Sequence, residues 1–86
     1  MKAAREGNLD KVISLILKGA DINTDYYLGW TPLHLASEEG HLDVVKYLIE
    51  KSADLNSRDN DGRTPLYWAS LNRHYDVVEY LKVKGA

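Results

Sequence analysis

The sequence predicts an all-α fold, a solenoid of stacked helix-turn-helix units with projecting hairpin-like loops. Two observations carry this prediction. The chain of 86 residues overlays on itself at a shift of 33 residues without any insertion, and a constant period of this size is typical of stacked repeat arrays. The pairs Thr31-Pro32 and Thr64-Pro65 are also helix-start signals, and the short apolar stripes that follow predict two helices per unit.

The self-similarity extends through the whole unit. The segment GWTPLHLA at residues 29–36 aligns with GRTPLYWA at residues 62–69. The second half of the unit recurs as GNLDKV at 7–12, GHLDVV at 40–45 and RHYDVV at 73–78. Because these motifs stay in register along the chain, the period outweighs any local propensity.

This register divides a single domain into three repeats, which are repeat 1 (1–28), repeat 2 (29–61) and repeat 3 (62–86) of the domain 1–86. Repeat 1 is truncated, since it lacks the Thr-Pro-Leu start. Repeat 3 has the character of a capping repeat, because Lys82 stands where Ile16 and Ile49 supply an apolar side chain and terminal repeats carry a polar outer face.

Repeat 2 contains the clearest helix signals. Thr31 before Pro32 predicts a helix start, because the hydroxyl caps a free N–H and proline suits the first helical position. Gly40 predicts the end of this helix in a left-handed conformation. An apolar stripe predicts the second helix, with Leu42, Val45, Leu48 and Ile49. The polar segment 52–62 ends in Asn-Asp-Gly, which predicts a hairpin-like loop.

Two positions depart from the glycine pattern at helix ends. Arg73 replaces the turn residue Gly40 of the preceding repeat. Ser52 stands where the other two repeats have Gly19 and Gly85. Both are therefore predicted to be non-glycine residues in the left-handed region, at a cost on the order of 1 kcal/mol each.

Composition narrows the possible function classes. Without cysteine, neither disulfides nor thiolate metal sites are available. The formal net charge of -2 argues against a nucleic-acid-binding surface, although residues 29–61 are acidic and residues 62–86 mildly basic. No apolar run is long enough for a membrane span or a signal peptide, so cytoplasmic or nuclear localisation is the default expectation.

The chain resembles the ankyrin-repeat family from end to end, on the G-x-T-P-L-H-x-A run at this period. The resemblance implies an ankyrin-repeat solenoid that serves as a non-catalytic protein-protein interaction module without a cofactor. It also implies that the loop tips and the concave side of the first helices form the binding surface. It does not identify the partner, because one scaffold serves many unrelated targets.

No group of residues predicts catalysis or metal binding. The resemblance implies that His34 bonds to the backbone of neighbouring loops and to the threonine of its motif. His41 and His74 recur once per repeat at the inter-helix turn, about 10 Å apart at the spacing of packed helices, which is too far to share one zinc ion. Glu38 and Glu39 are adjacent on a helix and point in different directions, unlike a catalytic carboxylate pair. The chain also lacks a catalytic triad or phosphate-loop motif, so we predict that it is not an enzyme.

Non-repeating residues must determine the partner, because the repeating ones build the scaffold. We predict a partner-binding surface from the two loop tips, the first-helix positions and one aromatic position at their edge: Tyr26, Tyr27, Leu28 and Trp30; Arg58, Asn60, Asp61 and Arg63; Glu38, Glu39, Leu71 and Asn72; and Trp68. Tyrosine and tryptophan dominate binding hot spots, and the acidic pair favours a partner with Lys or Arg. Alternatively, the aromatic tip folds back over the flank of repeat 1, and Trp68 fills space between repeats 2 and 3.

The first loop departs from the family pattern at its tip. Tyr26 occupies the place of Asp59, where the resemblance implies an aspartate that orders the hairpin. The geometry of the first loop is therefore left open.

Two alternative functions are compatible with the sequence. The truncated first repeat is expected to expose Val12, Leu15 and Ile16, which favours a weak end-to-end dimer of a chain that is otherwise expected to be monomeric. Asn23 and Asn56 each follow a leucine eight residues upstream, which is similar to asparagine-hydroxylation sites known in the family.

Overall fold

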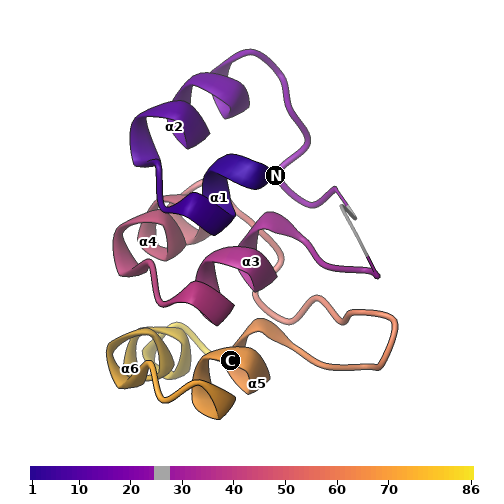
Figure 1. Cartoon of the computed structure of the whole chain (residues 1–86), viewed down its shortest axis with the longest axis vertical. Helices are drawn as coiled ribbons and strands as arrows, with labels where there is room; N and C mark the ends of the chain where they lie inside the picture. Colours follow the sequence, from indigo (N-terminus) through magenta and orange to yellow (C-terminus); the bar gives the residue numbers. More distant parts are fainter. Residues whose placement is uncertain (25–27) are drawn as a thin grey trace.

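The computed structural model describes residues 1–24 and 28–86, and these residues form three stacked helix pairs (Figure 1). The pairs are α1 (Lys2–Glu6) with α2 (Leu9–Leu17), α3 (Pro32–Glu39) with α4 (Leu42–Glu50), and α5 (Pro65–Leu71) with α6 (Tyr75–Val83). The first helices α1, α3 and α5 contact one another in one layer, and α2, α4 and α6 form the second layer. The loops that follow α2 and α4 project to the same side (Figure 1). The all-α, stacked helix-turn-helix prediction is confirmed.

The helices of repeats 2 and 3 begin where the sequence predicts. The Thr31 hydroxyl accepts a hydrogen bond from the backbone N–H of His34 at 3.4 Å. Thr64 caps α5 in the same way through the N–H of Tyr67 at 3.3 Å. In repeat 1, α1 has only 5 residues and no side-chain cap, so the first helix of the stack has the weakest local start.

The predicted left-handed positions are also confirmed. Gly40 ends α3 with φ 76°, and the non-glycine residues Ser52 and Arg73 have φ 71° and 60°. Leu28, which follows the tip of the first loop, has φ 54° and was not predicted to be left-handed. Each non-glycine residue in this region costs on the order of 1 kcal/mol, so the fold accommodates strain at three places among the described residues.

The core lies between the two helical layers and is centred on repeat 2. Of the 13 buried hydrophobic residues in the described part of the chain, the α3 and α4 helices contribute six, Leu33, Leu35, Ala36, Val44, Val45 and Leu48. Repeat 2 has a helical neighbour on either side, and neighbouring repeats bury the surface that one repeat cannot bury alone.

The expectation that repeat 1 exposes Val12 is wrong. Val12 is 0% exposed and belongs to the same core, and Leu15 and Ile16 are half-buried. The outer side of α2 carries Lys11 instead, at the position of the buried Val44 and Val77. The flank of repeat 1 is therefore polar, because the apolar side of α2 packs toward α1 and α4.

Equivalent positions show which side chains each repeat turns toward its neighbours. Two positions are covered in repeats 2 and 3 but exposed in repeat 1, so they face the preceding repeat. The first is occupied by Lys2, Leu35 and Trp68 in repeats 1, 2 and 3, and the second by Lys11, Val44 and Val77. Other positions are covered in repeats 1 and 2 but exposed in repeat 3, so they face the following repeat. One of them is occupied by Met1, His34 and Tyr67 in repeats 1, 2 and 3, and another by Leu9, Leu42 and Tyr75. The two ends of the stack are thus made of different side chains.

Candidate protein-binding surface

A buried carboxylate organises the second loop. The Oδ1 atom of Asp59 accepts hydrogen bonds from the backbone N–H groups of Asp61 and Arg63, both at 2.9 Å. Its Oδ2 atom accepts one from the indole Nε1–H of Trp68, also at 2.9 Å. Asp59 therefore fixes both the loop backbone and the orientation of a ring on α5.

These hydrogen bonds also change the acidity of the carboxyl group. Desolvation alone would raise the pKa of Asp59, but the N–H groups of Arg63, Trp68 and Asp61, together with His34, lower it below its usual value. Hydrogen bonds to the charged form stabilise that form. Asp59 is therefore ionised when it orders the loop at neutral pH.

Two tryptophans meet where repeats 2 and 3 adjoin. The ring centroids of Trp30 and Trp68 are 4.6 Å apart at an interplanar angle of 42°, and Tyr67 meets Trp68 edge-on at 5.2 Å. The guanidinium of Arg63 lies 4.9 Å from the centroid of Tyr67 and 5.6 Å from that of Trp68. We call Trp30, Arg63, Tyr67 and Trp68 the tryptophan cluster. Both tryptophans are half-buried, so each packs inside the array and keeps part of its surface in solvent.

The end of the first loop is joined to the second loop. The Leu28 carbonyl accepts a hydrogen bond from the backbone N–H of Asn60 at 2.9 Å. A Cβ atom on Gly29 would lie 2.6 Å from that nitrogen, so glycine is required for the two backbones to approach this closely. The Leu28 side chain is 56% exposed and adds apolar surface beside the tryptophan cluster. Tyr26 and Tyr27 lie outside the described residues.

His34 joins α3 to the next loop. Its Nδ1 atom accepts the backbone N–H of Thr31 at 3.2 Å, and its Nε2 atom donates to the Arg63 carbonyl at 2.8 Å. Burial lowers the pKa of His34, against the opposing effects of the Arg63 carbonyl and the Asp59 carboxylate. The neutral form with the proton on Nε2 fits this pattern, and the role agrees with what the family resemblance implies.

The other two histidines fasten each repeat to the one before it. The Nε2 atom of His41 donates to the Arg5 carbonyl at 2.9 Å, and that of His74 donates to the Glu38 carbonyl at 2.8 Å. Within the described part of the chain, no group of His, Cys, Asp and Glu is arranged to hold a metal ion. All three histidines have structural roles.

The acidic pair lies at the other end of α3 from Trp30. The 8 residues of α3 span about 12 Å at 1.5 Å per residue, so the two features do not touch. Burial raises the pKa of Glu38, the neighbouring Glu39 adds to the effect, and Arg5 opposes it. The side-chain amide of Asn72 donates to the Glu38 carbonyl at 3.0 Å. Asn72 thus has a role in stacking besides any role in binding.

A family model described as ankyrin repeats, in three copies, matches residues 1–86. The chain belongs to the ankyrin-repeat family. No match is found among curated proteins. Ankyrin repeats are generally protein-protein interaction modules, and the family is typically non-catalytic. No helix in the described ankyrin repeats is long and apolar enough to cross a bilayer.

The structure divides the predicted surface of this ankyrin array into three parts. Leu28, Trp30, Arg63 and Trp68 come together around the Asp59 carboxylate. Exposed side chains of the second loop form another part, with Arg58, Asn60 and Asp61. The last part lies at the ends of α3 and α5, with Glu38, Glu39, Leu71 and Asn72.

Sequence reasoning missed Tyr67, because this residue occupies the scaffold position of His34 in the repeat. The signal was the change from histidine to tyrosine at a position that faces the following repeat. A tyrosine there leaves the histidine-to-loop hydrogen bond unmade and provides a ring for Trp68 and Arg63.

Proposed function

We propose that the chain is a non-catalytic module that binds a protein partner through the tryptophan cluster, the loop tips and the concave ends of α3 and α5. The observation that supports it best is the tryptophan cluster. Large, partly exposed rings occupy non-repeating positions, and Asp59 holds one of them in place. Rings that are ordered before binding lose little entropy on binding and supply much apolar contact area.

Charge on the same face supports a basic partner. Glu38 and Glu39 are the last two residues of α3, and Glu39 is exposed. Complementary charge chiefly raises the association rate and orients the partner, whereas buried aromatic contacts supply affinity. We therefore expect a ligand that combines an apolar anchor with Lys or Arg.

Affinity capture from native extract tests this proposal with matched variants. Leu28→Asn removes an exposed leucine beside the tryptophan cluster, and Leu17→Asn removes a leucine that is 77% exposed on α2, away from that surface. We expect a defined set of proteins to be captured by the unmodified chain and the Leu17 variant but lost from the Leu28 variant. If the Leu28 and Leu17 variants captured the same proteins in equal amounts, the assignment of the surface would be rejected.

Salt dependence separates the acidic part of the surface from its aromatic part. Exposed charge pairs contribute only about 0–1 kcal/mol, so Glu39→Lys should mainly slow the association of a captured partner. It should also reduce the dependence of that rate on salt. Identical salt slopes for the unmodified chain and the Glu39 variant would leave the acidic pair without a function in binding.

Self-association through repeat 1 has weaker support. Val12 is buried, and the outward side chains of the first repeat include Lys2 and Lys11. Stacking another copy on this face would desolvate charged side chains without pairing them. We therefore expect a monomer, and sedimentation at several concentrations tests this.

A further inference from the structure

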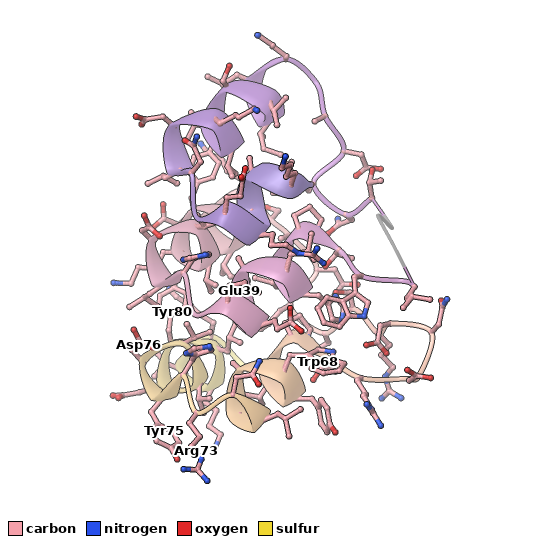
Figure 2. All side chains as sticks on the ribbon, in the orientation of Figure 1. Glu39, Trp68, Arg73, Tyr75, Asp76 and Tyr80 are labelled. Atoms are coloured by element: carbon pink, nitrogen blue, oxygen red, sulfur yellow. The ribbon has the colours of Figure 1, made fainter. Side chains whose placement is uncertain are left out.

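The end of the stack formed by α5 and α6 has an apolar surface that includes Tyr67, beside the second loop, and Tyr75 on α6. Tyr67, Leu71 and Tyr75 are 40%, 56% and 68% exposed. Their counterparts in repeat 2 are His34, which is buried, and Glu38 and Leu42, which are half-buried under repeat 3. Figure 2 shows Arg73 and Tyr75 at the foot of the stack. We call Tyr67, Leu71, Arg73, Tyr75 and Lys82 the end face.

Arg73 prevents another repeat of the same kind from stacking here. In repeats 1 and 2, the histidine of the following repeat lies directly on a glycine. A Cβ atom on Gly7 would lie 2.6 Å from the ring of His41, and one on Gly40 would lie 2.5 Å from the ring of His74. Arg73, with φ 60°, places a Cβ atom and a long side chain at the equivalent point. The end face is therefore apolar but closed to a repeat that carries this histidine.

Charge argues against a second copy of the chain as the occupant. Residues 62–86 carry four basic side chains, Arg63, Arg73, Lys82 and Lys84, and two acidic ones, Asp76 and Glu79. Two end faces brought together would oppose like charges. The other end of a second copy presents Lys2 and Lys11, which would also repel the end face. Like charges in contact disfavour association.

We propose that the end face docks an amphipathic helix of another protein, with apolar side chains flanked by Asp and Glu. The occupant is helical because the same positions in repeats 1 and 2 receive the helices of the next repeat. The apolar stripe of such a helix covers Leu71 and the two tyrosines. Its acidic flanks pair with Arg73 and Lys82, which border the apolar surface. The end face shares Tyr67 and Leu71 with the proposed binding surface, whereas Arg73, Tyr75 and Lys82 lie outside that surface, so variants of these three residues test the end face alone.

A displayed peptide library tests the proposal. Its members are about 18 residues long, so that a helix is stable enough to form, with apolar residues fixed at i, i+3, i+4 and i+7 and the remaining positions random. Selection on the unmodified chain should enrich Asp and Glu beside the apolar stripe. The enriched peptides should bind Tyr75→Ser about tenfold more weakly, and Arg73→Glu should remove the acidic preference.

Three controls decide the interpretation. Leu17→Ser removes an exposed leucine on another face and should leave binding unchanged, as should Leu28→Asn, and circular dichroism melting checks that each variant folds. Enrichment without acidic bias, no enrichment at all, or equal loss with Leu17→Ser would overturn the proposal. A concentration-dependent dimer that Tyr75→Ser abolishes would also overturn it, because the occupant would then be a second copy. Loss of binding with Leu28→Asn alone would place the peptides on the loop-tip surface instead.

Discussion

The first and last repeats are built on the same 33-residue unit, yet they present opposite kinds of surface at the two ends of the stack. At the first end, Lys2 and Lys11 occupy positions that are covered and apolar in the other repeats. At the last end, Tyr67 and Tyr75 are exposed at positions that other repeats cover. Water solvates the first end at little cost, whereas the last end leaves apolar area that a partner can bury. The array therefore has a direction that the repeat pattern alone does not reveal.

The two repeats differ in their internal support as well. In repeat 3, Thr64 caps α5 and proline follows it, while Asp59 orders the preceding loop. In repeat 1, α1 is shorter and has no side-chain cap. The stability of a repeat array is approximately the sum of the stabilities of its repeats and of the interfaces between them. These differences therefore predict that repeat 1 unfolds first.

The largest expected effect tests this difference with equivalent leucines. Leu81 is 0% exposed in repeat 3, whereas its counterpart Leu15 is half-buried in repeat 1. Leu81→Ala should lower the free energy of unfolding by about 3 kcal/mol, and Leu15→Ala by roughly half as much, because less apolar area and a smaller cavity are involved. Urea unfolding followed by circular dichroism measures both. Equal losses would mean that the two end repeats are equally supported.

The second prediction concerns the order that Asp59 gives to the second loop, where the first loop has Tyr26 at the equivalent position. The pKa of Asp59 lies below the ordinary value of 3.8, so its stabilising contribution is present above that pH and is lost as the pH falls through the lower, folded-state pKa. Asp59→Asn should cost about 1–2 kcal/mol at pH 7 and flatten the fall in stability below about pH 4. Asp61→Asn, on an exposed neighbour in the same loop, is the control. An unchanged acid limb in the Asp59 variant would contradict the hydrogen-bond assignment.

Much of this architecture could be predicted from sequence because it is local. The caps at Thr31 and Thr64 and the left-handed conformations of Ser52 and Arg73 each depend on a few neighbouring residues, and all were predicted. The burial of Val12 was not, since the period identifies equivalent positions but not which neighbour covers them.

The candidate site was predicted less completely, because its geometry depends on contacts between repeats. Trp30 and Trp68 are 38 positions apart in the sequence, and only the packing of one repeat on the next brings their rings together. The predicted surface residues are exposed or half-buried where the structure describes them, but they form separate groups. Nothing local in the sequence distinguishes one continuous surface from several.

A smaller effect is expected at Ser37, which lies at a position that the following repeat covers. Ser37 is fully buried, and its Oγ atom lacks a hydrogen-bond partner in the described part of the chain. Its counterparts are the buried Ala4 and the exposed Ser70. Ser37→Ala should raise the free energy of unfolding by about 1 kcal/mol, since it removes an unsatisfied buried hydroxyl. Ser70→Ala should change stability little, because water solvates that hydroxyl. A gain of the same size at both positions would point to helix propensity rather than burial.

The smallest expected effect concerns the residue that closes the last end. Arg73 is exposed and has φ 60°, a conformation that glycine adopts without steric cost. Arg73→Gly should therefore raise the free energy of unfolding by about 0.5–1 kcal/mol. Arg73→Ala removes the same charge but keeps a Cβ atom, and so should give no such gain. Thermal melting of both variants separates backbone strain from charge. If alanine stabilised the chain as much as glycine, repulsion among the basic side chains of repeat 3 would be the cause. If only glycine does, the array tolerates strain at the position where a side chain prevents another repeat from stacking.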